Sequence, residues 1–402
     1  MSAFYIPIPV NELALVRFAF MYDDLKTAPI PCFVATSLTT DAVFNTRSLL
    51  STTHGPAKRT RGLAPPIGML RMFISRSGSL AEEITKKGED NQKRVFCFRI
   101  LSGVYFGTMV FIPPQVSCRA YAKINLGLRV TAERTDGYHE ICTVFHRIGL
   151  FDEILLRPAD SITVHTTDPV VPSGETNICH AAALMLRESL NGGTGVGAGV
   201  SIAITKSIPA GAGLGGGSAD AAAVLRSLPA LWGTGIAEGD LRGLALRLGS
   251  DVPFFLGDDS ALGTGRGEVL EYFRLDLPFA LLLCTPPVQV STRWAYSRIL
   301  PRPPARPDQE DLRSVLMRGM SDPPFLREHL VNDFEAPVFR EYPVIRSIKE
   351  SMVRDGALFA SMSGSGSSVY GFFQDMGAAA LAAASLNSPG FRTFITPPHF
   401  RV

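Results

Sequence analysis

The chain has 402 residues, of which 46% are hydrophobic and 19% charged, and its formal net charge is +2. This length predicts two or three domains, and the composition is ordinary for a globular protein. The small net charge excludes the strong field with which proteins hold nucleic acids or acidic membranes, so we expect neither as a partner. The nearest approach to a transmembrane segment, Ile100 to Pro113, is shorter than the roughly 20 residues that span a bilayer.

The cysteines favour a reducing compartment. Because no Cys-x-x-Cys pair occurs, the pattern argues against a zinc site and against a disulfide framework. We therefore expect free thiols and a cytoplasmic location. The six cysteines are Cys32, Cys97, Cys118, Cys142, Cys179 and Cys284.

Residues 1–115 differ from the rest of the chain and are expected to be an N-terminal extension. They show no sustained helical period, and Thr36 to Arg61 is basic and rich in Ser and Thr. Such a segment is typical of a transit peptide, which would place the protein in the plastid stroma, but an extra domain or a translated upstream region is also open. Of the explanations for this extension, we prefer a true start at Met109. A disordered leader is our second choice, and a targeting peptide is our third. The extension is thus expected to be poorly structured or absent from the native protein.

The chain beyond residue 115 alternates predicted strands and helices. A helix is expected over Asn177 to Ser189, where apolar residues recur with helical spacing. A glycine-rich, flexible connection, Asn191 to Gly199, follows it. The predicted strands of this region are Ala120 to Val130, Thr143 to Leu150, Asp152 to Arg157, Ser161 to Thr166 and Val200 to Lys206.

A glycine-rich loop follows the last of these strands and leads into a helix that we expect to begin at Ser218. Five glycines stand between Gly211 and Gly217. Glycine lets backbone N–H groups turn inward, and a helix N-terminus adds unpaired donors and a positive dipole end. Phosphate is the commonest anion at such a site, so the loop predicts an enzyme that uses a nucleotide.

Two nucleotide motifs and one structural interpretation compete for this loop. Gly211-x-Gly213-x-x-Gly216 satisfies a dinucleotide fingerprint, but no second parallel strand ending in an acid follows at the expected distance. The Walker A pattern fails because no Gly-Lys-Ser/Thr closes the loop. A connection without a ligand remains open, although short loops do not need so many glycines.

The last third of the chain predicts a second lobe. A helix is expected from Asp240 to Leu248, and a domain boundary lies between Glu268 and Pro278. The elements expected beyond it are a buried strand Phe279 to Cys284, an exposed loop Leu300 to Asp308, strands Leu358 to Met362 and Ser368 to Phe373, and a helix Ala378 to Leu386. This order indicates an α+β architecture in two lobes, with the active cleft between them.

Four ordered segments carry a resemblance to the GHMP small-molecule kinases, from about Ser117 to the C-terminus. They are Ala120 to Val130, Asp136-Gly-Tyr138-His139, Leu248-Gly-Ser-Asp251-Val-Pro-Phe-Phe255 with the glycine loop, and Ser361 to Tyr370. The resemblance implies a two-lobed kinase fold, with an ATP-binding domain over 116–272 and a C-terminal domain over 273–402. It also implies ATP and Mg²⁺ as cofactors.

The second and third segments resemble one branch of this kinase family in particular, the branch that acts in non-mevalonate isoprenoid synthesis. Its substrate is a small molecule bearing a cytidine diphosphate group. In this family Asp251 would act as the base and Lys123 as its electrostatic partner, while Asn125 would hydrogen-bond the substrate hydroxyl. Without the family, a turn aspartate before Pro253 and a solvent-facing lysine on an edge strand are the ordinary interpretations.

Further binding residues follow from the same resemblance. Tyr138 and His139 would contact the cytidine, and Tyr296 aligns loosely with a second stacking aromatic, with Trp294 as its rival. Asn177 would lie on the adenine side, although a helix cap is its simpler role. The remaining nucleotide-binding residues would be Pro209, Ala210, Gly211, Ala212, Gly213, Leu214, Gly215, Gly216, Gly217, Ser218 and Ala219.

The role of Ser218 stays open, because it can be a plain N-cap or can approach the phosphate and its Mg²⁺. No protein metal site is evident in the sequence. Gly364-Ser365-Gly366 is expected to form a tight turn that backs the phosphate loop and closes the cleft.

Three alternatives to this function stay open. The first is another kinase of the superfamily, acting on mevalonate, homoserine or a sugar. The others are a nicotinamide or flavin oxidoreductase and a non-catalytic binding protein. The chain is expected to be a monomer or a homodimer.

Overall fold

The computed structural model describes residues 15–18, 69–75, 93–100, 103–112, 115–190, 199–299 and 311–402. They divide into two units, Met1–Gln115 and Val116–Val402. In the first unit, an antiparallel sheet has the strand order β1-β2-β4-β3. Its strands are β1 (Leu15–Phe18), β2 (Met69–Ser75), β3 (Lys93–Ile100) and β4 (Gly103–Ile112). The expected poor structure of this extension falls mostly outside the described residues, but its described parts are strands.

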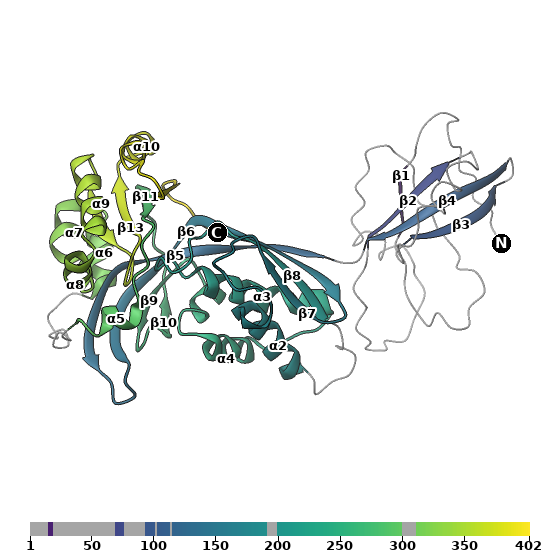
Figure 1. Ribbon diagram of the computed structural model, residues 1–402, viewed down its shortest axis with the longest axis horizontal. Coiled ribbons are helices and arrows are strands. Elements are labelled where there is room, and N and C mark those ends of the chain that lie inside the picture. The colour runs from purple at the N-terminus through teal and green to yellow at the C-terminus, as the bar shows by residue number, and fades with distance from the viewer. Residues whose placement is uncertain are drawn as a thin grey trace. The chain divides into compact units, whose positions relative to one another are not determined.

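A long antiparallel hairpin, β5 (Val116–Glu133) and β6 (His139–Ala159), runs along the second unit (Figure 1). On its other edge β6 pairs antiparallel with β8 (Gly199–Thr205) and β9 (Ser260–Thr264). Strand β7 (Ile162–Thr166) runs parallel to β8, and β10 (Val269–Tyr272) pairs with β9. The first sheet of this unit therefore contains six strands.

Strand β6 is continuous, whereas the sequence analysis broke it into two strands at Phe151. In the structure Asp152 is fully buried and is paired with Lys206, so the strand runs through it. The pairing joins residues far apart in sequence, which explains why a local pattern did not reveal it.

Helices α2 (Ile178–Leu190), α3 (Gly216–Trp232) and α4 (Glu238–Leu248) lie on one side of the hairpin (Figure 1). The buried face of α3 is rich in alanine, which lets the helix approach the sheet closely. The expected starts, Ser218 and Asp240, were each two residues late. At α3 the reason is that glycines in a first turn were assigned to the loop.

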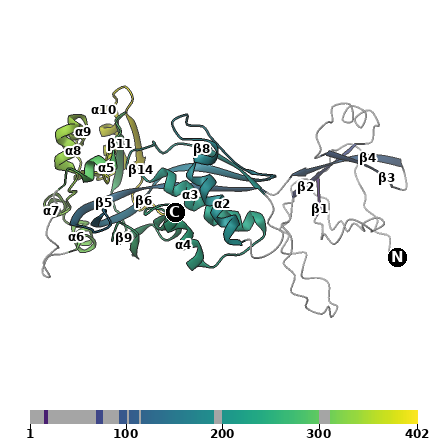
Figure 2. The ribbon, with the colours of Figure 1, turned by 60° about the horizontal axis from the view of Figure 1, so that its bottom comes forward.

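The C-terminal part of this unit builds a second sheet, with the strand order β12-β13-β11-β14 and antiparallel pairing throughout. Its helices gather at the end of the hairpin remote from β7 and β8 (Figure 1), and Figure 2 shows the same separation from β8. The strands are β11 (Ala280–Thr285), β12 (Phe359–Met362), β13 (Val369–Phe373) and β14 (Arg392–Thr396). The helices are α5 (Thr292–Tyr296), α6 (Leu312–Gly319), α7 (Pro323–His329), α8 (Glu335–Glu341), α9 (Pro343–Arg354) and α10 (Met376–Ser385).

The expected α+β class is confirmed. Short 3₁₀ turns complete the element list, η2 (Gly174–Thr176) and η3 (Pro253–Leu256). The predicted connections Asn191 to Gly199 and Leu300 to Asp308 fall almost wholly outside the described residues. Within the part of the chain that the structure describes, no helix is long and apolar enough to cross a membrane.

Candidate active site

The glycine loop leads directly into the N-terminus of α3. Gly211, Gly213 and Gly215 all have positive φ, between 69° and 79°, and Gly215 is the N-cap residue. The N–H of Ala219 donates to the carbonyl of Gly215 at 2.8 Å. The N–H groups of residues 216–218 therefore have no partner within the helix, and no acidic residue stands in its first turn. This geometry suits a phosphate group.

The predicted turn Gly364-Ser365-Gly366 does back this loop. A Cβ on Gly213 would lie 2.7 Å from the carbonyl oxygen of Ser363 and 2.8 Å from that of Gly366. The N–H of Ser368 donates to the carbonyl of Ala212 at 3.3 Å. Only glycine allows such a close approach between the two backbones, so the second lobe contacts the loop without an intervening side chain.

Lys123 connects the loop to the expected base. Its backbone N–H donates to the carbonyl of Leu214 at 2.9 Å, and its ammonium lies 3.3 Å from the carboxylate of Asp251. The ammonium also donates to Oδ1 of Asn125 at 2.7 Å. Lys123 is only 5% exposed, so the alternative of a solvent-facing lysine on an edge strand is wrong. The structure thus brings Lys123, Asn125, Asp251 and the loop together.

Two residues that the sequence analysis missed orient Asn125. Its Nδ2 donates to Oγ1 of Thr143 at 2.9 Å, and its backbone N–H donates to Oγ of Ser363 at 3.2 Å. Thr143 in turn donates to the carbonyl of Gly127 at 2.6 Å, so each hydroxyl has a defined role. A local signal was present, because Thr143 is a polar residue with apolar neighbours on both sides, Cys142 and Val144.

The expected aromatic residues separate into two places. His139 stacks on Tyr296, with ring centroids 4.8 Å apart. Burial, together with the negative charge of Asp251, raises the pKa of Tyr296 to about 12, which places this pair near the base. Tyr138 is 55% exposed on the turn between β5 and β6, and the guanidinium of Arg266 lies 4.9 Å from its ring centre.

The rival aromatic Trp294 faces away from this pair. Its ring meets Tyr342 edge to face at 5.5 Å, whereas Tyr296 stacks on His139. The two neighbouring aromatics of α5 therefore point to different surroundings. This arrangement favours Tyr296 over Trp294 as the aromatic near the base.

Asn177 and Ser218 differ in how far they are already engaged. The side chain of Asn177 accepts from the N–H of Cys179 at 2.8 Å and donates to the carbonyl of Pro172 at 2.7 Å, so it caps α2. Its adenine-side role stays a prediction. Ser218 is the third residue of α3 rather than its N-cap, since Gly215 takes that place. Its hydroxyl is therefore not needed to begin the helix.

A buried ion cluster lies beneath the start of α3, and the sequence analysis missed it. The ammonium of Lys206 lies 2.5 Å from Asp152 and 2.7 Å from Asp220, and 3.4 Å from where a Cβ on Gly216 would stand. Asp152 also accepts from the backbone N–H groups of Ser207 and Ile208. The cluster therefore anchors both the chain entering the loop and the helix leaving it. A lone aspartate among alanines in α3 was the available signal.

The charges of this cluster are unequal. Burial alone would lower the pKa of Lys206, but the carboxylates of Asp220 and Asp152 outweigh burial and raise it. Burial raises the pKa of Asp220 to about 7, and the charge of Asp152 acts in the same direction against that of Lys206. Two carboxylates thus share one ammonium.

Comparison with known proteins places these features in a family. The model of the GHMP kinases N terminal domain matches residues 177–258, and that of the GHMP kinases C terminal matches residues 321–391. A 4-diphosphocytidyl-2-C-methyl-D-erythritol kinase of Chlorobium phaeobacteroides (strain BS1) is 42% identical over 292 residues, which are 71% of this chain and 98% of that protein. The kinase of the same name from Salinibacter ruber is 41% identical over 69% of this chain and 97% of its own length.

Solved structures agree with the sequence comparison. A crystal structure of 4-(cytidine 5'-diphospho)-2C-methyl-D-erythritol kinase superposes with a TM-score of 0.58 at 34% identity, covering 71% of this chain and all of that one (100%). A homoserine kinase from Cytophaga hutchinsonii has a TM-score of 0.54 at 21% identity, covering 71% of this chain and 95% of its own, and supports the fold alone. The oxidoreductase alternative fails on topology, because the parallel partner of β8, strand β7, precedes α3 rather than following it.

We expect Gly213→Ala to impair both the loop and its contact with the second lobe. Alanine would adopt positive φ and would place its Cβ against two carbonyl oxygens, at a cost of about 1–3 kcal/mol in the free energy of unfolding. Urea unfolding and nucleotide titration would measure the two effects. Gly235→Ala is the matched control, because no atom lies within 4 Å of its Cβ position. Equal behaviour of the two variants would contradict this assignment.

We expect Asp220→Asn to change how stability depends on pH. The folded state holds the Asp220 proton more tightly than the unfolded chain, so this group's contribution to stability decreases as pH rises from its ordinary pKa of 3.8 to about 7. The free energy of unfolding of the wild type minus that of the variant should therefore be smaller at pH 8 than at pH 5. Denaturant titrations at both pH values measure this difference, with the exposed Asp258→Asn as control. A difference that is independent of pH would refute the assignment.

Proposed function

This chain belongs to the 4-diphosphocytidyl-2-C-methyl-D-erythritol kinases of the GHMP kinase family, and we propose that it phosphorylates the 2-hydroxyl of that cytidyl substrate with ATP. The reaction belongs to non-mevalonate isoprenoid synthesis. The observation that carries the proposal is the direct link from the phosphate loop through Lys123 to Asp251. An acid, an ammonium and an anion site in contact are the parts that phosphoryl transfer to an alcohol requires.

Asp251 is the proton acceptor in this proposal. Its carboxylate would take the proton of the substrate hydroxyl as that oxygen bonds to the γ-phosphorus, while the bond from the γ-phosphorus to the β–γ bridging oxygen breaks and ADP leaves. The carboxylate side chain is 35% exposed, so a substrate can reach it. Lys123, 3.3 Å away, is placed to stabilise negative charge on the attacking oxygen. Asn125 would orient the same hydroxyl.

The loop and α3 suit the triphosphate of ATP. The N–H groups of residues 216–218 lack partners within the helix, and the loop glycines allow the phosphates to approach the backbone. Among the described residues, no group of three His, Cys, Asp or Glu side chains could hold a metal ion by itself. We propose that Mg²⁺ arrives with the nucleotide, since this ion keeps several waters and binds through phosphates and one or two protein ligands. The hydroxyl of Ser218, in the first turn of α3, would help to hold the ion, which would supply charge neutralisation.

His139 and Tyr296 are proposed to bind the cytosine. They stack near Asp251, so a base held by this pair would bring its attached substrate toward the carboxylate. Tyr138, exposed on the neighbouring turn, can cover the same ligand from outside. Mevalonate and homoserine have no aromatic base, so the aromatic pair favours the cytidyl substrate over these alternatives.

Replacing Asp251 by Asn should lower turnover by a factor on the order of a hundred or more, and Lys123→Ala should have a similar effect. The reason is loss of the proton acceptor in one variant and of the neighbouring charge in the other. A coupled assay of ADP release with the cytidyl substrate measures turnover, and calorimetry checks that ATP still binds. Asp258→Asn, an exposed carboxylate nearby, is the control. Near-normal turnover in either variant would remove that residue from the mechanism.

Cytidine nucleotides should bind the protein and compete with the substrate, whereas mevalonate should not. His139→Ala should weaken cytidine diphosphate binding by about tenfold, since stacking on one base is worth roughly 1–3 kcal/mol. Trp294→Ala should leave that binding unchanged because Trp294 packs on Tyr342 instead. Fluorescence or calorimetric titration gives both affinities. Tight binding of mevalonate without cytidine binding would favour another GHMP kinase activity.

A further inference from the structure

The turn that follows Asp251 ends in carbonyl groups that side chains hold from outside. This is η3, in which Pro253 and Phe254 direct their carbonyl oxygens to the hydroxyl of Tyr272, at 3.0 and 3.2 Å. Tyr272 comes from β10 and fills the space where a Cβ on Gly257 would stand. The N–H of Gly257 also donates to the carbonyl of Phe254 at 3.2 Å. A short 3₁₀ turn leaves other carbonyls at its end without internal partners, so side-chain donors help to determine where the turn lies.

Two arginines complete this attachment. Nη2 of Arg147 donates to the carbonyls of Phe255 at 2.7 Å and Gly257 at 2.9 Å. Nη2 of Arg226 donates to the same carbonyl of Phe255 at 2.5 Å. We call Arg147, Arg226 and Tyr272 the turn clamp. Its three members come from β6, α3 and β10, so the turn is fixed to three separate elements.

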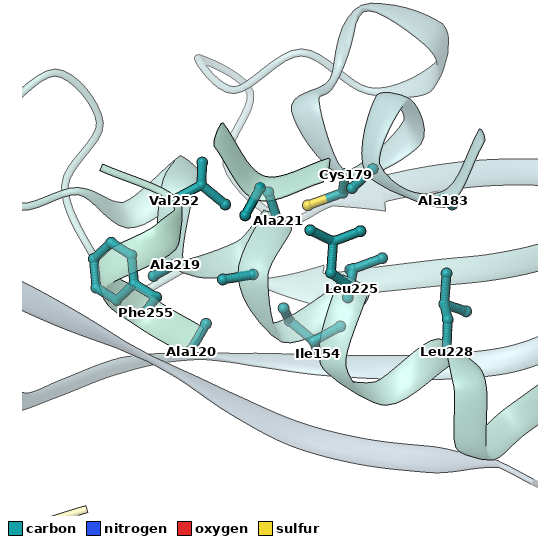
Figure 3. Close-up of a cluster of buried hydrophobic side chains, with 14 of the residues drawn as sticks. Ala120, Ile154, Cys179, Ala183, Ala219, Ala221, Leu225, Leu228, Val252 and Phe255 are labelled. Carbon is teal, nitrogen blue, oxygen red and sulfur yellow. The ribbon is translucent and has the colours of Figure 1, made fainter. Parts of the chain in front are cut away.

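The elements that supply the clamp also carry the rest of the site. Arg147 on β6 is the register partner of Lys123 on β5. Arg226 lies on α3, the helix whose N-terminus forms the phosphate site. The ring of Phe255 lies 2.9 Å from where a Cβ on Gly215 would stand, so the clamped turn touches the loop itself. Figure 3 shows Val252 and Phe255 beside the alanines of α3.

The clamp is electrostatically costly, which argues against a role in packing alone. Arg147 is buried, and its Nε has no hydrogen-bond partner among the described residues. Burial lowers the pKa of Arg147, and the charge of Arg226 acts in the same direction, against the opposite charge of Asp259. Two guanidinium groups on one carbonyl repel each other, and an apolar contact would have filled the same space more cheaply.

We propose that the turn clamp positions Asp251 against Lys123 and the phosphate loop, so that its members are positioning residues for phosphoryl transfer. The inference rests on the proposed role of Asp251 as base. Arg226 is the most informative member, because it ties α3, whose N-terminus is the proposed phosphate site, to the turn that follows the base. Movement of the base by about 1 Å is enough to cost up to a hundredfold in rate, and this step needs no change in substrate affinity.

A double-mutant cycle on Arg226 and Asp251 tests the proposal. Arg226→Ala should lower kcat by about tenfold and leave KM for ATP and for the cytidyl substrate within about twofold. In the Asp251→Asn background the same change should cost little further, because there is no base left to position. Arg226→Lys should restore part of the rate, since an ammonium can still donate to the Phe255 carbonyl. Arg354→Ala, an exposed helical arginine, is the matched control.

The outcomes distinguish the positioning role of the turn clamp from the proposed role of Asp251 as base. An unchanged kcat in Arg226→Ala, or an equal loss in both backgrounds, would overturn the clamp while leaving Asp251 as base. Near-normal turnover of Asp251→Asn would overturn the proposed function and this inference with it. If Arg226→Ala fails to fold, Tyr272→Phe removes a single hydroxyl and should show the same pattern with a smaller loss. A higher KM with an unchanged kcat in Tyr272→Phe would contradict the proposal.

Discussion

The site depends on Lys123, which acts through its backbone and its side chain at once. The backbone N–H holds the phosphate loop at Leu214, and the ammonium faces Asp251 and Asn125. In the proposed mechanism, a single strand residue thereby sets the distance between the triphosphate site and the carboxylate that accepts the proton. Because the residue is buried, this distance depends on the packing of β5 rather than on a mobile side chain.

Charge is placed around this residue in three layers. The N-terminus of α3 presents positive potential without an acidic residue in its first turn. Beneath it, Lys206 with Asp152 and Asp220 anchors the entry to the loop and the body of the helix. Beside it, two arginines and Tyr272 hold the turn that follows Asp251. Helix α3 takes part in all three, so in the proposed mechanism it is the element that links the nucleotide site to the proton acceptor.

Local sequence patterns predicted β5–β8, β11–β13, α2–α4 and α10, but they did not predict β1–β4, β9, β10, β14, α5–α9 or the contacts that make the site. Alternation and apolar runs revealed the strands, and glycine spacing revealed the phosphate loop. The helical spacing of Ile345, Ile348 and Met352 in α9 was also readable, although no helix was predicted there. Lys123 and Asp251 were identified through the family resemblance, because each alone has an ordinary structural explanation. Arg147 and Arg226 escaped notice since their partners are backbone carbonyls, which leave no trace in the sequence.

The most direct test of the account is a crystal structure of the protein with a non-hydrolysable ATP analogue and the cytidyl substrate bound together. We predict that the triphosphate contacts the N–H groups of the loop and the first turn of α3. The substrate 2-hydroxyl should lie about 2.6–3.2 Å from the carboxylate of Asp251, facing the γ-phosphorus. A triphosphate bound away from α3, or a hydroxyl turned away from Asp251, would contradict the account.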